Sequence, residues 1–145
     1  MNKELSYSVD TIVVAYKSRD VIRACVLSLI DDPVVRKVVV VNNSPEDRLS
    51  DVLDDLDRVE IVPSTNNIGF GSAINSVRHL VEAPYVLLAN PDCTTQKGTV
   101  DALADILVRN PRIGIAAARM SNPDGSLHQN SQRLTTLPMM IGKTL

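Results

Sequence analysis

The sequence predicts an α/β domain with a mainly parallel sheet that is covered by helices on both faces. Short runs rich in β-branched residues alternate about four times with segments whose apolar residues repeat every three or four positions. This alternation is typical of parallel strands, because each crossover must be long enough to contain a helix. The 145 residues, 44% of them hydrophobic, suffice for one domain with a buried core.

The first strand is expected at Thr11–Tyr16, a β-branched run with the composition of a buried strand. A helix follows, with Asp20 at a position that predicts a cap. Asp31-Asp32-Pro33 is expected to end this helix. Its apolar residues recur with helical period: Val21, Ile22, Cys25, Val26, Leu29 and Ile30.

A second strand is expected at Val38–Val41, and a second helix follows it. The helix is marked by apolar residues at spacings of three and four: Leu49, Val52, Leu53 and Leu56. Four aspartates in the same segment resemble a metal cluster by composition alone: Asp51, Asp54, Asp55 and Asp57. At helical period most of them fall on the solvent side, so we expect a solvated face.

The rest of the chain continues the alternation. In order, the pattern predicts a strand at Val59–Val62, a helix at Gly71–Val81, a strand at Tyr85–Ala89, a helix containing Val100 and Leu107, and a fifth strand at Ile113–Ala117. No internal repeat, linker or low-complexity segment interrupts it.

Composition argues against several classes of function. The formal net charge of -2 and the 3% aromatic content are unlike those of proteins that bind nucleic acid. Cys25 and Cys93 lack the spacing of metal ligands and are expected to be packing residues. The first residues do not resemble a signal peptide, and no apolar run approaches the roughly 18 residues of a membrane span. We therefore expect a cytoplasmic chain with no transmembrane segment.

Polar segments follow four of the predicted strands, where ligands of open parallel sheets bind. They are Ala15-Tyr16-Lys17, Asn42-Asn43-Ser44, Ser64-Thr65-Asn66-Asn67 and Asn90-Pro91-Asp92. For a single Asn-rich segment, turn chemistry is the better explanation. Four such segments at one edge of a sheet make ligand binding about as good an explanation as turn chemistry. No glycine precedes Gly69, so a glycine-rich phosphate loop is absent from the first strand's end.

Asp92 is the one acidic residue at the carboxyl end of a predicted strand. A lone carboxylate there suits a divalent cation shared with phosphate oxygens, because Mg²⁺ usually takes one or two carboxylates plus substrate phosphates. A turn or helix-capping carboxylate in Asn-Pro-Asp is the alternative.

Together these segments resemble glycosyltransferase family 2, the inverting enzymes of the GT-A fold, and most closely its rhamnosyltransferase-like members. Val13–Tyr16 resembles the family's first strand, and Val38–Ser44 resembles its second strand and Asp-Asn-x-Ser loop. Asn66–Asn75 resembles the Asn-x-Gly-Phe/Tyr-Gly-x-Ala-x-Asn signature, and Leu87–Asp92 the Asn-Pro-Asp form of the metal-binding Asp-x-Asp motif. Asn122–Ser126 resembles the Asp-Pro-Asp-Gly-Ser turn of the subgroup.

The resemblance implies a site for a nucleotide-diphosphate sugar, either a dTDP-sugar or a UDP-sugar. It also implies that Asp92 ligates a Mg²⁺ or Mn²⁺ ion that bridges the diphosphate. The donor-binding residues that it implies are Ala15, Tyr16, Asn42, Asn43, Asn67, Gly69, Gly71, Asn75 and Asn90. Ala15 and Tyr16 would flank the base, and Asn42-Asn43 would meet the base or ribose. The segment from Asn67 to Asn75 would shape the donor pocket, with its glycines permitting a close approach.

Two departures from the family pattern follow. Val41-Asn42-Asn43 lacks the acidic residue that usually grips the nucleoside, and an amide binds less strongly than a carboxylate. No acidic residue follows Asp124, so no candidate for the general base of an inverting transfer is found and the catalytic residue stays unknown.

We therefore expect residues 1–145 to be a single domain, the N-terminal donor-binding part of a truncated enzyme, or alternatively a binding module without turnover. An unrelated receiver-like or flavodoxin-like domain is disfavoured by the missing acidic pair and phosphate loop. The apolar segment Leu137–Ile141 is expected to pack against a further element or a second copy of the chain. A full-length form is expected at the inner face of the membrane, acting on a lipid-linked or polysaccharide acceptor.

Overall fold

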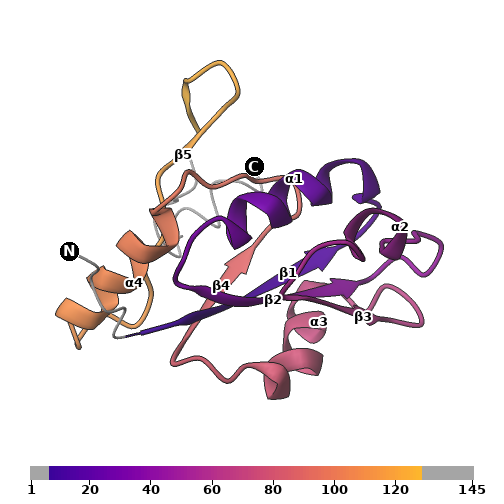
Figure 1. Cartoon of the computed structure of the whole chain (residues 1–145), viewed down its shortest axis with the longest axis horizontal. Helices are drawn as coiled ribbons and strands as arrows, with labels where there is room; N and C mark the ends of the chain where they lie inside the picture. The colour runs from indigo at the N-terminus through magenta and orange to yellow at the C-terminus, as the bar shows by residue number, and fades with distance from the viewer. Residues whose placement is uncertain (1–6, 129–145) are drawn as a thin grey trace, which may run out of the picture.

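The computed structural model describes residues 7–128, which form a four-stranded parallel sheet with helices on both faces (Figure 1). The strands stand in the order β3-β2-β1-β4, and each neighbouring pair is parallel. Their bounds are β1 (Val9–Ala15), β2 (Val35–Asn42), β3 (Val59–Pro63) and β4 (Tyr85–Ala89). The predicted parallel α/β fold is confirmed.

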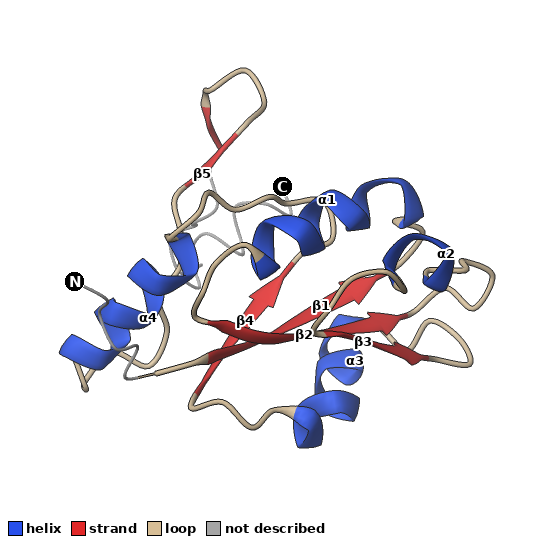
Figure 2. Ribbon diagram, viewed as in Figure 1, coloured by secondary structure: helices blue, strands red, loops and turns tan. Residues whose placement is uncertain are grey.

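Helices lie on both faces of the sheet (Figure 2), with a buried apolar cluster beneath the helices on each face. On one face, Val13 packs in a buried cluster with residues of α1 (Arg19–Ile30), α2 (Ser50–Leu53) and α4 (Thr99–Arg109). On the other face, Ile12 packs with Ala73 and Val77 of α3 (Phe70–Val77), which continues as the 3₁₀ turn η1 (Arg78–Leu80). Because successive strand residues point to opposite faces, β1 contributes to both clusters and is buried along its whole length.

Element bounds differ from the predicted ones mainly at the ends. The N-cap of α1 is Ser18, while Asp20 lies in the first turn and makes no capping bond, so its predicted role is wrong. The segment expected to form a helix from Leu49 to Leu56 contains only the four residues of α2. Its aspartates are all exposed, as predicted, and Asp51 and Asp55 pair with arginines of α1.

The fifth strand predicted at Ile113–Ala117 is wrong. Residues 113–119 form no helix or strand, and Ile115 is 88% exposed. Pro111 and a turn from Ile113 N to Asn110 O precede the segment, and Gly114 interrupts it. β-Branched composition expresses only a local preference, whereas a strand also needs a partner that supplies ladder hydrogen bonds.

A short antiparallel hairpin of β5 (Met120–Ser121) and β6 (Leu127–His128) projects from the body of the molecule (Figure 1). Asp124 closes its turn, because its carboxylate accepts hydrogen bonds from the Ser126 amide at 2.9 Å and hydroxyl at 2.6 Å. The Asn-Pro-Asp-Gly-Ser sequence thus forms a turn stabilised within itself.

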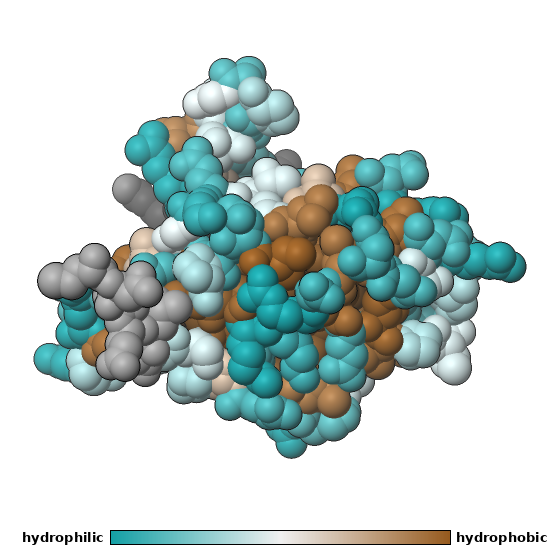
Figure 3. All heavy atoms as spheres, in the orientation of Figure 1, coloured by the Kyte–Doolittle hydropathy of each residue, from teal (hydrophilic) through white to brown (hydrophobic). Residues whose placement is uncertain are grey.

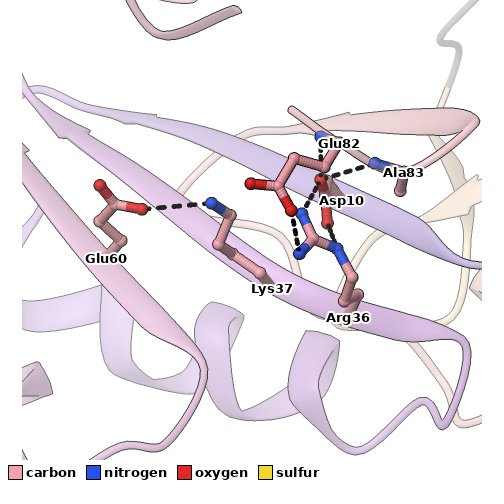
Figure 4. Close-up of polar contacts among 6 residues, drawn as sticks. All are labelled: Asp10, Arg36, Lys37, Glu60, Glu82 and Ala83. Atoms are coloured by element: carbon pink, nitrogen blue, oxygen red, sulfur yellow. Dashed lines mark hydrogen bonds and ion pairs between the residues drawn. The ribbon is translucent and has the colours of Figure 1, made fainter. Parts of the chain in front are cut away.

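A buried carboxylate ties three segments together at the sheet (Figure 4). Asp10 of β1 is fully buried and receives two hydrogen bonds from the Arg36 guanidinium of β2, at 2.8 and 2.6 Å. It also accepts the backbone amides of Glu82 and Ala83, which precede β4, at 2.8 and 3.0 Å. Lys37 and Glu60 form a further, more exposed pair between β2 and β3.

Among residues 7–128, no helix is long and apolar enough to cross a membrane. The apolar segment Leu137–Ile141, expected to meet another element or copy, lies outside the described residues.

Candidate functional site

The candidate site lies where the strand order changes direction. From β1 the chain adds β2 and β3 on one side and then returns to place β4 on the other. Val13 pairs with Ala89, so β1 and β4 end side by side. The crevice beyond the carboxyl ends at such a switch point is where open α/β sheets bind ligands. Tyr16 directly follows β1 and Asn90 directly follows β4 at this edge of the sheet.

Backbone and side-chain hydrogen bonds join the loops after β1, β2 and β3. The Asn43 amide donates to Ala15 O at 2.8 Å, and the Lys17 amide donates to Ser44 Oγ at 2.8 Å. The Ser64 amide in turn donates to Asn42 O at 2.9 Å. Three of the four polar segments singled out from the sequence are therefore joined to one another: Ala15–Lys17, Asn42–Ser44 and Ser64–Asn67. We refer to these joined segments as the wall.

The buried side chains of Asn42 and Asn43 add further hydrogen bonds within this wall. Asn42 is 8% exposed, donates to Asp47 O at 2.8 Å and accepts the Ser44 amide at 3.1 Å. Asn43 is 2% exposed and donates to Asn67 Oδ1 at 3.1 Å. The side-chain amides of both asparagines therefore already have hydrogen-bond partners within the protein, and these bonds hold the loops together.

The loop before α3 shows where glycine is required. Gly69 has a φ of 81°, a backbone conformation that favours glycine, and its amide donates to Asn67 Oδ1 at 2.9 Å. Gly71 lies inside α3, and a Cβ there would meet no atom within 4 Å. The fold therefore requires glycine at position 69 and tolerates a side chain at position 71.

Asn75 is placed apart from the other implied donor residues. Ala73 and Val77 of α3 face the sheet, while Asn75 lies between them in sequence and is exposed. The structure thus brings Asn43, Asn67 and Gly69 into contact but leaves Asn75 on the outer side of the helix.

Tyr16 and Lys17 present an aromatic ring and a cation beside the crevice. Tyr16 is 48% exposed, and Lys17 Nζ lies 5.5 Å from the centre of its ring. Lys17 has a φ of 51°, uncommon for a residue with a side chain. The sequence analysis included Lys17 in the polar segment after the first strand but did not count it among the donor-binding residues.

After β4, Asn90 and Asp92 are both exposed. Asn90 O accepts the Cys93 amide at 3.3 Å and the Cys25 thiol of α1 at 3.3 Å. Asp92 Oδ1 receives a long contact of 3.7 Å from Cys93 Sγ.

The donor set at this position suits an ion shared with a ligand. The described part of the chain contains no group of three or more His, Cys, Asp or Glu side chains able to hold a metal. A divalent ion at Asp92 would therefore need ligands from outside the protein, such as phosphate oxygens and water, an arrangement common for Mg²⁺.

Both cysteines stay protonated at neutral pH. Burial raises the pKa of the Cys25 thiol to about 12, with smaller effects from Cys93 and Asp92. Burial and the neighbouring Asp92 carboxylate also raise the pKa of Cys93. A protonated Cys25 is able to donate its hydrogen bond to Asn90 O.

The model of the family described as glycosyl transferase family 2 matches residues 10–145. The chain belongs to glycosyl transferase family 2. This membership confirms the family that the motifs around Tyr16, Asn67 and Asp92 predicted.

Among the curated relatives of this family 2 chain is N-acetylglucosaminyl-diphospho-decaprenol L-rhamnosyltransferase of Mycobacterium tuberculosis, from strains CDC 1551 / Oshkosh and ATCC 25618 / H37Rv. The identity is 28%, over 77% of this chain and 40% of the relative. The chain therefore spans less than half the length of these curated relatives.

Solved structures agree on the fold. TarS 1-349 of S. aureus, in complex with UDP-GlcNAc, superposes with a TM-score of 0.63 at 21% identity, over 70% of this chain and 31% of that one. The mannosyltransferase PcManGT of Pyrobaculum calidifontis, in complex with GDP-Man and Mn²⁺, gives 0.67 at 21% identity, over 82% and 37%. This likeness is one of fold, and it supports the GT-A-type α/β fold that the motifs predicted.

Proposed function

We propose that this family 2 chain carries the donor-binding part of an inverting glycosyltransferase that uses a nucleotide-diphosphate sugar. The observation that carries the proposal is the exposed Asp92 carboxylate after β4, at the edge of the sheet where the joined loops after β1, β2 and β3 also lie. The relatives support the substrate class, because neighbours in the same fold are bound to UDP-GlcNAc or GDP-Man.

The proposed donor lies in the crevice with its base beside Ala15 and Tyr16, whose ring is half exposed. Asn42, Asn43 and Asn67 hold the wall and present backbone groups to the base and ribose. Gly69 and Gly71 permit close approach of the ligand, and Asn90 borders the diphosphate. Asn75 completes the donor-binding set, from the exposed side of α3.

Asp92 would hold a Mg²⁺ or Mn²⁺ ion together with oxygens of the diphosphate. When bound, the ion would supply positive charge that stabilises the departing nucleoside diphosphate. Lys17, beside Tyr16 after β1, would add positive charge at the same edge of the sheet. None of these residues is a general base, so the proton of the acceptor is taken by a group outside this set.

The proposed donor is a dTDP- or UDP-sugar, with rhamnose as the transferred sugar. The relative of M. tuberculosis supports this choice, because its name describes an L-rhamnosyltransferase acting on N-acetylglucosaminyl-diphospho-decaprenol. By the same likeness, the proposed acceptor is lipid-linked and belongs to cell-envelope synthesis. The protein would then work in the cytoplasm, at the inner face of the membrane.

A binding module without turnover is the second candidate. Such a module would lack a general base, and residues 125–145 contain no acidic side chain that could serve as one. Sugar transfer and donor binding distinguish the two candidates, because a module binds the nucleotide sugar and releases it unchanged.

Calorimetric titration of the chain with UDP and with dTDP, with and without Mn²⁺, tests the proposal. We expect binding that is tighter with Mn²⁺ and that falls to the metal-free affinity in Asp92→Ala, because the ion would lose the Asp92 carboxylate. A folded chain that binds neither nucleotide would contradict the proposed donor site.

The chain contains a matched control for this substitution. Asn122-Pro123-Asp124 repeats the tripeptide Asn90-Pro91-Asp92 in the projecting hairpin. Asp124→Ala should leave Mn²⁺-dependent nucleotide binding unchanged. Metal-dependent affinity that survives in Asp92→Ala would remove Asp92 from the site.

A further inference from the structure

The loop that carries Asp92 has no regular structure of its own. Residues 90–98 connect β4 to α4 and contain neither helix nor strand. A ligand of a metal ion must nevertheless be held in a defined place by the groups behind it. The contacts that hold this loop come from α1, more than sixty residues earlier in the chain.

The first attachment precedes Asp92. The Cys25 thiol donates to Asn90 O at 3.3 Å, and the Cys93 amide donates to the same oxygen at 3.3 Å. One carbonyl thus fixes both the start of the loop and the tight turn in which Asp92 stands. Cys25 is 1% exposed, so its position is set by the core.

The second attachment follows Asp92. Ser28 Oγ donates to Cys25 O at 2.7 Å and accepts the Thr95 amide at 3.0 Å. Thr95 Oγ1 donates to Ser28 O at 3.1 Å, which makes the contact reciprocal. Cys25 and Ser28 lie three residues apart, so they share one face of α1.

We propose that Ser28, with Cys25, is a positioning residue that holds the loop so that Asp92 meets the metal-bound diphosphate. The inference rests on the proposed function, since it concerns the same carboxylate. Two attachments on a rigid helix, one on each side of Asp92, limit how far the carboxylate moves when the ion arrives. Substitution of groups behind a metal ligand typically weakens metal binding on the order of 10-fold or more.

The test is Mn²⁺ affinity, measured by electron paramagnetic resonance in the presence of whichever of UDP and dTDP the unsubstituted chain binds. Ser28→Ala removes the acceptor of the Thr95 amide, and Thr95→Val removes the hydroxyl donor at nearly constant shape. We expect each variant to bind Mn²⁺ about 10-fold more weakly. Nucleotide affinity without metal should be unchanged, because the wall around Tyr16 does not contact Ser28 or Thr95.

Rescue and control variants separate positioning from a general effect on folding. Thr95→Ser retains the hydroxyl and should restore Mn²⁺ affinity. Ser76→Ala removes the same kind of bond within α3, from Ser76 Oγ to Ala73 O at 2.8 Å, and should change nothing. Thr94→Val alters the neighbouring exposed threonine and should also be neutral.

The possible failures are distinguishable. Unchanged Mn²⁺ affinity in both Ser28→Ala and Thr95→Val would overturn the inference and leave Asp92 in its proposed role. An equal loss of metal-free nucleotide binding would also overturn it, because the effect would then reach the whole crevice. An unsubstituted chain that binds nucleotide without any effect of Mn²⁺ would overturn the metal role of Asp92 and this inference together.

Discussion

Gly69 and Gly71 are two residues apart, and they are glycines for different reasons. Gly69 is the N-cap of α3 and has a positive φ, so the fold itself favours glycine there. At Gly71 a Cβ would meet open space, and the backbone is helical. The fold does not require glycine at position 71. Under the proposed function, glycine at this position leaves room for the bound donor.

Gly71→Ala separates stability from binding at this position. We expect the free energy of unfolding to stay the same or to rise by up to about 1 kcal/mol, because alanine is the better helix former. Nucleotide affinity should fall about 10-fold, because the added methyl group crowds the ligand. Thermal unfolding and calorimetric titration measure the two effects.

The neighbouring Ser72→Ala is the control, since Ser72 is exposed in the same turn of α3. Equal nucleotide affinity in Gly71→Ala and the unsubstituted chain would show that no ligand approaches this glycine.

At the scale of elements, the position of α4 depends on a side chain from another part of the chain. Asp32 follows α1 and is fully buried, and its Oδ2 accepts the amides of Val100 at 3.0 Å and Asp101 at 3.4 Å. These amides lie in the first turn of α4, whose own N-cap residue is Gly98 and offers no side chain. A carboxylate distant in sequence thus caps the helix.

Asp32→Ala should lower the free energy of unfolding by about 1–2 kcal/mol, the usual cost of losing a helix cap. Chemical denaturation monitored by circular dichroism checks this value. Asp31→Ala is the matched control, because the adjacent Asp31 makes only an exposed ion pair with Lys97 at 3.2 Å. A loss of stability as large in Asp31→Ala would argue against the capping role.

At the scale of the whole molecule, Asp10 joins β1, β2 and the turn into β4 (Figure 4). Burial by itself opposes ionisation of Asp10, but hydrogen bonds from Arg36 and from the amides of Glu82 and Ala83 outweigh it and lower its pKa. The carboxylate therefore contributes stability that is present above the pKa of an unfolded aspartate, about 3.9, and is lost as the pH falls further.

Asp10→Asn should lower the free energy of unfolding by about 3 kcal/mol at pH 7, because Arg36 and the backbone amides of Glu82 and Ala83 lose a charged partner. Stability should also fall less steeply below about pH 4 in the variant than in the unsubstituted chain. Denaturation series at several pH values measure both effects. Glu60→Gln, which removes the more exposed pair with Lys37, should cost less than about 1 kcal/mol.

Large apolar side chains remain on the surface of the described residues. Val86 and Leu88 of β4 are 49% and 47% exposed, and Phe70 is 49% exposed. On the face drawn in Figure 3, hydrophobic atoms gather over the middle of the molecule, with hydrophilic atoms around them.

The sequence by itself determined the fold class, the four strands of the parallel sheet and the polar segments at its carboxyl edge. These features are local, because a run such as Val38–Val41 expresses its preference through side-chain branching and the period of its apolar residues. The family motifs around Asn67 and Asp92 are local in the same sense. Each can be read from consecutive residues.

Only the tertiary structure decided which side chains meet. It showed that Asn43 binds Asn67 instead of facing solvent, that Asp32 caps α4, and that Ser28 holds the Asp92 loop through Thr95. Each contact joins residues more than twenty positions apart. Strand order and helix packing decide which of these residues, far apart in sequence, meet in space, and no stretch of consecutive residues encodes them. The predicted strand at Ile113–Ala117 failed for the same reason, because composition supplied a preference and the fold supplied no partner.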